Sequence, residues 1–213
     1  MIIDYSLYLI ADAKACHPKS LINAIQEIID EGITCVQLRM KKHSLEEVLS
    51  VAKQLLFLLK PRNIPLIIND HIEVAKAIDA DGVHIGQKDR PYAWVRQQIG
   101  YKKIIGLSIE NIQQAEQCKT LDCDYFGVGP VFATSTKSDA SPPIGLVNLE
   151  KITSILSKPV VAIGGINQTN INSVLTKEIS GVALAAGIFS ATTPKKATRK
   201  LSQTLSQFHS YAK

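Results

Sequence analysis

The hydrophobic positions of the chain follow two periods that alternate from one end to the other. Short apolar runs recur eight times, and stretches with an apolar residue at every third or fourth position separate them. The first pattern predicts strands at residues 6–12, 34–40, 65–70, 82–86, 103–108, 125–129, 159–165 and 181–187. The second predicts helices, among them residues 20–32, 44–60, 111–121 and 146–156, with Ser20, Ser44 and Asn167 as N-caps and Gly32 as a C-terminal stop.

Regular alternation of strands and helices indicates an α/β fold with a parallel sheet, because right-handed crossovers return each strand in the same direction. Eight such units could close into a barrel or form an open, doubly wound sheet. No GxGxxG motif follows the first strand, and eight units exceed the roughly five or six of the open sheet. We therefore expect a single (β/α)8 TIM barrel over residues 1–213, at the short end of the size range of that fold.

Composition narrows the class of protein further. With 46% hydrophobic residues the chain can bury a large core, and no run approaches the roughly 18 apolar residues of a membrane span. Asp4 and the lack of a basic stretch before the first apolar run argue against a secretory signal. The cysteines form neither a CxxC pair nor a zinc pattern, so a cytoplasmic protein with reduced thiols fits best; they are Cys16, Cys35, Cys118 and Cys123.

Two kinds of partner could explain the positive charge of the chain. A net charge of +5 and a pI near 9.0 are compatible with nucleic-acid binding. The basic residues are scattered, however, and the densest cluster, at residues 195–200, has no aromatic residue within it. We therefore expect no nucleic-acid partner and no membrane partner, and instead a basic site for a phosphorylated small molecule. The sequence leaves the oligomeric state open, a homo-oligomer included.

Basic residues follow the second predicted strand. Gln37, Arg39 and Lys41 share a parity, so their side chains point to one face, and in a TIM barrel the carboxyl ends of all strands form one active face. A guanidinium and an ammonium beside an amide suit a polyanion joined to a hydrogen-bonding ring. The alternative is a solvated basic strand end.

Acidic and hydroxyl groups end the next strands. Asn69 and Asp70 end the third strand, and Asp89 follows the fourth. The two carboxylates could bind Mg²⁺, pair with the basic residues, or cap the following helices. We expect His84 to be a hydrogen-bonded packing residue, and Ser108 either to contact a substrate or to cap the next helix.

Small residues and one long loop complete the predicted face. The seventh predicted strand ends at Gly164 and Gly165, and the eighth ends at Ala185, Ala186 and Gly187. Glycines at these two strand ends would let backbone N–H groups approach an anion, as is usual for phosphate sites of these barrels. The connection at 129–143 is long, polar and closed by two prolines. Loops of this kind are usually functional or disordered. We interpret this one as a lid, with Thr134, Thr136 and Lys137 over the mouth.

The ordered set of motifs resembles the thiamine-phosphate synthase (thiamine-phosphate pyrophosphorylase) family. The resemblance runs from about Tyr8 to Phe189 and rests on QLRMK, IIND, DGVHIGQKD, DYFGVGPVFATSTK and AIGGI. It implies a TIM-barrel transferase that joins 4-amino-2-methyl-5-hydroxymethylpyrimidine diphosphate to 4-methyl-5-(2-phosphoethyl)thiazole or its carboxylated form. The implied products are thiamine phosphate and pyrophosphate, formed by a dissociative, Mg²⁺-assisted substitution.

The resemblance also implies a role for each matching position. The residues expected to bind the pyrimidine diphosphate are Gln37, Arg39, Lys41, Asn69, Ser108 and Lys137. Those expected to bind the thiazole phosphate are Thr134, Ser135, Thr136, Gly165, Ala185 and Ala186. Asp70 and Asp89 would bind Mg²⁺, the cofactor, and the catalytic residues would be Arg39, Lys41, Ser108 and Lys137.

Three positions depart from the family pattern. Met40 and Lys88 replace acids, which makes the mouth more basic, and Ala186 stands where a serine is common. Alternative functions are a related thiazole tautomerase and a thiamine-phosphate-binding protein without turnover. In the tautomerase a histidine follows the strand-five serine, where this chain has Glu110. An aldolase-type barrel is disfavoured because Lys137 lies about ten residues past its strand, too far for a Schiff-base lysine inside the barrel.

Overall fold

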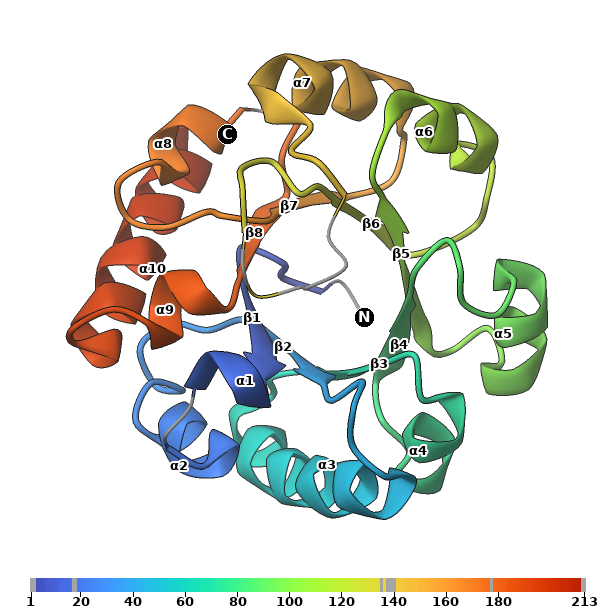
Figure 1. The fold of residues 1–213 in the computed structure, drawn as a ribbon, viewed down its shortest axis with the longest axis vertical. Helices are drawn as coiled ribbons and strands as arrows, with labels where there is room; N and C mark the ends of the chain where they lie inside the picture. Colours follow the sequence, from blue (N-terminus) through green and yellow to red (C-terminus); the bar gives the residue numbers. More distant parts are fainter. Residues whose placement is uncertain (1–2, 17–18, 135, 137–140, 177, 212–213) are drawn as a thin grey trace.

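The computed structural model describes residues 3–16, 19–134, 136, 141–176 and 178–211. Eight parallel strands close into a barrel in which each pairs with its neighbours in sequence and the last pairs with the first (Figure 1). The strands are β1 (Leu7–Asp12), β2 (Cys35–Arg39), β3 (Leu66–Asn69), β4 (Gly82–Ile85), β5 (Ile104–Ile109), β6 (Tyr125–Val128), β7 (Val160–Ile163) and β8 (Gly181–Leu184). The expected TIM barrel is therefore confirmed.

Helices surround the barrel as an outer ring (Figure 1). They are α1 (Ala13–Cys16), α2 (Leu21–Gln26), α3 (Leu45–Leu59), the 3-10 helix η1 (Lys60–Arg62), α4 (Ile72–Ala77), α5 (Tyr92–Ile99), α6 (Ile112–Cys118), α7 (Gly145–Ile155), α8 (Ile171–Val174), α9 (Ala186–Phe189) and α10 (Pro194–Tyr211). None of the helices in the described part of the chain combines the length and the apolar character that a membrane crossing needs.

Two of the three predicted helix caps are confirmed. Ser44 forms a capping box with Glu47 at the start of α3, and Ser20 accepts a backbone hydrogen bond at the start of α2. The prediction for Asn167 is wrong, because α8 begins three residues later, after Asn170. The Asn167 side chain instead closes a local turn by accepting from the backbone N–H of Thr169 at 2.9 Å.

The strand residues divide between two apolar layers. On β1, Leu7 and Leu9 belong to the core between barrel and helices, whereas Tyr8 and Ile10 belong to the core inside the barrel. This follows from the two-residue period of a strand. The large ring of Tyr125 fits inside because Gly106 faces it, and a Cβ atom on Gly106 would lie 2.1 Å from Cζ of Tyr125.

The inward positions change from apolar to polar along the strands. On β2 the inward residues are Cys35, Gln37 and Arg39 in order, and on β3 Ile67 is followed by Asn69. The lower part of the barrel is therefore packed with mostly apolar side chains, and the polar side chains lie toward the carboxyl ends of the strands. This is the arrangement expected of a TIM barrel.

Candidate active site

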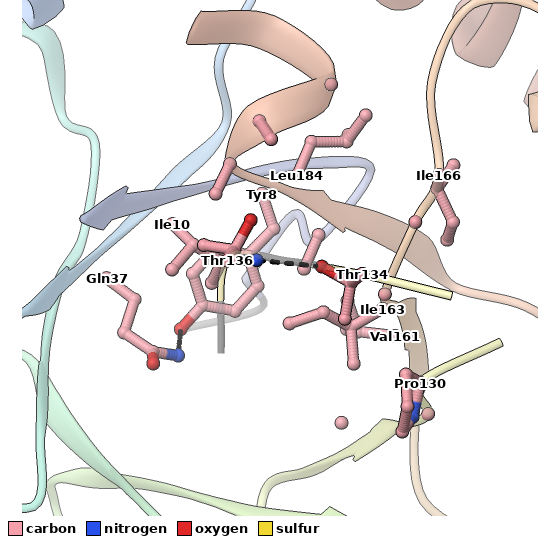
Figure 2. Close-up of a pocket in the computed structure, with 18 of the residues that line it drawn as sticks. Tyr8, Ile10, Gln37, Pro130, Thr134, Thr136, Val161, Ile163, Ile166 and Leu184 are labelled. Atoms are coloured by element: carbon pink, nitrogen blue, oxygen red, sulfur yellow. Dashed lines mark hydrogen bonds between the residues drawn. The ribbon is translucent and has the colours of Figure 1, made fainter. Parts of the chain in front are cut away.

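A cavity of about 570 Å³ opens at the carboxyl ends of the strands. Its walls include side chains of Tyr8 and Ile10 on β1, Val161 and Ile163 on β7, and Leu184 on β8 (Figure 2). Ten of the predicted site residues line it: Gln37, Arg39, Lys41, Asn69, Ser108, Thr134, Thr136, Gly165, Ala185 and Ala186. The barrel thus brings together residues that are separated by up to about 150 positions in the sequence.

The Arg39 guanidinium is held by an acid that the sequence analysis did not single out. Nη1 of Arg39 donates to Oδ2 of Asp12 at 2.7 Å, and the side chain of Asp12 is 7% exposed. The other carboxylate oxygen of Asp12 accepts from the backbone N–H of Lys14 at 2.9 Å. Asp12 is the last residue of β1 and pairs in register with Arg39, so the rule that strand ends carry the chemistry could have found it.

Asp70 and Asp89 do not line the cavity themselves, but each contacts a residue that does, Asp70 through Lys41 and Asp89 through Gly86. Nζ of Lys41 lies 3.0 Å from Oδ2 of Asp70. Burial raises the pKa of Asp70, the Lys41 ammonium opposes the rise, and the neighbouring Asp89 adds to it. Oδ2 of Asp89 accepts from the backbone N–H of Gly86 at 2.7 Å. Neither acid is the N-cap of a helix, since His71 is the N-cap residue of α4 and Pro91 is that of α5.

These two acids fit a Mg²⁺ ion of the predicted kind. Two neighbouring carboxylates, one with a raised pKa, favour a bound cation because it relieves their repulsion. No three His, Cys, Asp or Glu side chains in the described part of the chain gather closely enough to hold a metal. A site of two carboxylates suits Mg²⁺, which keeps waters and takes substrate phosphate oxygens as further ligands.

Asn69 presents a buried donor without a partner. Its side chain lines the cavity, the residue is 6% exposed, and Nδ2 has no hydrogen-bond partner among the described residues. Buried polar groups are almost always hydrogen-bonded, so a group left over in a cavity indicates a ligand acceptor. Asn69 therefore presents to the cavity a donor that is unpaired within the described part of the chain.

The opposite side of the cavity is made of small residues and backbone. Gly165 has a φ of +65°, and a Cβ atom there would lie 2.5 Å from the carbonyl oxygen of Ala133. Only glycine therefore allows the loops after β6 and β7 to pack together. Ala185 and Ala186, at the start of α9, line the same side.

The loop after β6 reaches over this side. Thr134 and Thr136 line the cavity, and the backbone N–H of Thr136 donates to Oγ1 of Thr134 at 3.3 Å (Figure 2). The returning end of the loop is tied down where Oγ of Ser141 donates to Oε2 of Glu110 at 2.7 Å. Ser135 and Lys137, both predicted to bind substrate, lie outside the described residues.

A buried chain of hydrogen bonds crosses the floor of the cavity. It joins Gln37, Tyr8, Tyr125, His84 and Ser108, which come from β2, β1, β6, β4 and β5. Ser108 lines the cavity and is not a helix cap, because Asn111 caps α6. His84 is hydrogen-bonded, as predicted. Tyr8 and Tyr125 had no predicted role, although both occupy inward positions of predicted strands.

Comparisons with known proteins agree with this geometry. A family model described as thiamine monophosphate synthase matches residues 7–188. A thiamine-phosphate synthase of Desulfitobacterium hafniense (strain Y51) is 41% identical over 201 residues, which cover 94% of this chain and 97% of the relative. Another from Chloroflexus aurantiacus is 42% identical over 200 residues, covering 94% and 92%.

A solved structure extends the comparison to three dimensions. The thiamine phosphate pyrophosphorylase of Pyrococcus furiosus superposes with a TM-score of 0.86 at 32% identity, covering 96% of this chain and 97% of that one. The family model spans most of the chain, and the relatives match it over nearly their whole length. This chain belongs to the thiamine monophosphate synthase family.

Proposed function

We propose that this protein is a thiamine-phosphate synthase, a transferase that joins the pyrimidine diphosphate to the thiazole phosphate and releases pyrophosphate. The observation that carries the proposal is the two-sided cavity. Arg39, Lys41 and Asn69 lie at the ends of β2 and β3, whereas Gly165 and Ala185 follow β7 and β8, at a different part of the barrel rim. A cavity of about 570 Å³ is within the range of small-molecule sites, so two small substrates can meet in it. Family membership supports the same activity.

The proposed reaction is a substitution at the carbon that bears the diphosphate. The bond between that carbon and the bridging oxygen breaks, and its electron pair leaves with pyrophosphate. The aminopyrimidine ring delocalises the resulting cation, and the thiazole nitrogen supplies the electron pair of the new C–N bond. The protein therefore has to stabilise negative charge on the leaving group and needs no general base.

The residues on the basic side suit this demand. Arg39 is held in place by Asp12, and its other guanidinium nitrogens, which have no hydrogen-bond partner among the described residues, can receive a phosphate oxygen. Lys41 stands beside Asp70 at the cavity edge, where it adds a second positive charge. Asp70 and Asp89 would hold Mg²⁺, which would supply further positive charge for the leaving pyrophosphate. Lys137 is proposed to act with them.

The remaining walls have to exclude water, because the cation would react with it. Ile10, Val161 and Ile163 give the cavity apolar surface close to the polar floor. Thr134, Ser135 and Thr136 are proposed to bind the thiazole phosphate together with Gly165, Ala185 and Ala186. The loop that carries the hydroxyl residues would then close over both substrates.

The test is to mix both substrates with Mg²⁺ and the full chain and to follow pyrophosphate and thiamine phosphate together. Equal amounts of the two products are expected. A tautomerase would rearrange the thiazole carboxylate without releasing pyrophosphate, and a binding protein would retain both substrates unchanged. Either of these results would overturn the proposal. Pyrophosphate without thiamine phosphate would also contradict it, since it would show hydrolysis alone.

A further inference from the structure

In the five-residue hydrogen-bonded chain across the cavity floor, each group donates to the next in one direction. Nε2 of Gln37 lies 3.1 Å from the hydroxyl oxygen of Tyr8, which lies 2.8 Å from that of Tyr125. The hydroxyl oxygen of Tyr125 lies 2.9 Å from Nδ1 of His84, and Nε2 of the same ring lies 2.9 Å from Oγ of Ser108. Figure 2 shows the first link, with the amide of Gln37 turned toward Tyr8.

The direction follows from counting protons, beginning at Gln37. An amide nitrogen only donates, so the oxygen of Tyr8 accepts from it and the proton of Tyr8 goes to the oxygen of Tyr125. The proton of Tyr125 then goes to Nδ1 of His84. That leaves the ring proton of His84 on Nε2, where it is donated to Oγ of Ser108.

Other proton arrangements satisfy fewer of the five groups in this hydrogen-bonded chain. If Nδ1 of His84 carried a proton, the oxygen of Tyr125 would face two donors, and its own proton would lose its acceptor in this chain. Burial raises the pKa of Tyr8 and of Tyr125 well above the ordinary value, so both phenols keep their protons. The Cys35 thiol also interacts with Tyr8, but a thiol is a weak acceptor, so the proton of Tyr8 goes to the Tyr125 oxygen 2.8 Å away.

We infer that Tyr8, Tyr125 and His84 are positioning residues that fix Ser108 as a hydrogen-bond donor toward the substrate. A serine hydroxyl can both donate and accept, and it rotates to suit its partner. With His84 donating to its oxygen, the proton of Ser108 is directed away from the ring and into the cavity that Ser108 lines.

The same chain sets the other end of the floor. Because Nε2 of Gln37 is turned to Tyr8, the amide oxygen of Gln37 remains as the acceptor. The floor thus offers an acceptor at Gln37 and donors at Ser108 and Asn69. This pattern selects a heteroaromatic ring edge that carries an amino group beside ring nitrogens. The substrate part of this inference rests on the proposed function, whereas the tautomer of His84 does not.

The tautomer can be measured directly by nitrogen NMR on the full chain labelled with ¹⁵N-histidine, without ligand and at mildly alkaline pH. The chain has five histidines, and the His84→Gln variant identifies the His84 signals by their loss. We expect Nδ1 to be unprotonated and Nε2 to be protonated. The opposite tautomer, or a doubly protonated ring, would overturn the inference.

Three phenylalanine variants, one of them a control, then test the individual hydrogen bonds of the hydrogen-bonded chain. Tyr125→Phe removes the donor to Nδ1, so the single tautomer should give way to a mixture, and kcat/KM for the pyrimidine diphosphate should fall about three- to tenfold, the range for one neutral hydrogen bond. Tyr8→Phe leaves that donor in place, so the tautomer should persist. Tyr5→Phe is the matched control. Tyr5 packs on Tyr125 with ring centroids 4.7 Å apart, but it is not a member of the hydrogen-bonded chain.

The possible results separate the two proposals. An unchanged tautomer in Tyr125→Phe, or equal losses in Tyr125→Phe and Tyr5→Phe, would show that Tyr125 only fills space. Circular dichroism and thermal unfolding of each variant establish that it is folded. If the wild-type protein shows the inferred tautomer but makes no thiamine phosphate, the proton arrangement stands and the proposed function is wrong.

Discussion

Arg39 and Asp12 lie opposite one another on neighbouring strands, and their side chains form an ion pair with Nη1 and Oδ2 separated by 2.7 Å. The pair is largely buried, with 16% of the Arg39 side chain and 7% of the Asp12 side chain exposed. A flexible guanidinium is thereby held in one orientation before any diphosphate arrives. This reduces the conformational entropy that the arginine loses on binding.

We expect Asp12→Asn to destabilise the protein because it leaves the Arg39 charge without its partner. Breaking a buried ion pair costs about 3–5 kcal/mol, and water in the cavity should keep the loss in the free energy of unfolding near 3 kcal/mol. Urea unfolding measures it. Asp30→Asn is the control, since Asp30 pairs with Arg62 at the same distance on the surface and should matter little. Equal losses would contradict the prediction.

Arg39→Ala should distinguish the two substrates. The loss of a charge-assisted hydrogen bond costs roughly 1.5–3 kcal/mol, which corresponds to about ten- to more than a hundredfold in affinity for the pyrimidine diphosphate. Affinity for the thiazole phosphate should change little, because its predicted site lies on the other side of the cavity. Calorimetric titration of each substrate measures this, with Arg62→Ala as the control. An equal loss for both substrates would mean that Arg39 supports the whole cavity.

Replacing either acid at the cavity edge should weaken the binding of Mg²⁺ and lower the activity together. We expect Asp70→Asn and Asp89→Asn each to abolish most turnover and to weaken Mg²⁺ binding, and EDTA should inactivate the wild-type protein. Asp79→Asn is the matched control, because Asp79 is a surface acid paired with Lys103. The measurements are turnover and Mg²⁺ affinity. Normal activity in both site variants would refute the metal assignment.

The raised pKa of Asp70 predicts how stability depends on pH in the absence of metal. The folded protein holds this proton more tightly than the unfolded chain, so the contribution is present below the ordinary value of 3.8 and is lost as pH rises through the raised pKa. The Asp70→Asn variant has no titrating carboxyl at this position, so its stability does not fall in this way as pH rises. Its free energy of unfolding should therefore improve relative to the wild type as pH rises through that window, as urea unfolding in EDTA can measure. A constant difference would count against the shift.

Much of this architecture could be predicted because it depends on local pattern. The two-residue period placed Gln37 and Arg39 on the inward face, and the barrel then brought Asn69 and Ser108 to the same cavity. Capping predictions held where a serine directly preceded a long apolar period, as at Ser44. At Asn167 two asparagines stood three residues apart, and the sequence pattern did not decide between them.

The rest depends on contacts between distant residues. Tyr8 and Tyr125 are separated by 117 positions and read as ordinary strand residues, since only closure of the barrel brings their hydroxyls to 2.8 Å. The pairing of Asp12 with Arg39 likewise needs the register of β1 against β2. A pattern along one strand indicates which side a residue faces. It does not indicate which residue meets it there.

The fit of Tyr125 against Gly106 has a consequence for how this site can change during evolution. The ring that fills the space above Gly106 also carries the hydroxyl that contacts His84, so packing and chemistry share the same atoms. Any side chain added at Gly106 would displace that ring and break the polar chain with it. Gly106 and Tyr125 therefore cannot be substituted independently during evolution. Related proteins that acquire new substrates should differ in the loops above the cavity floor instead.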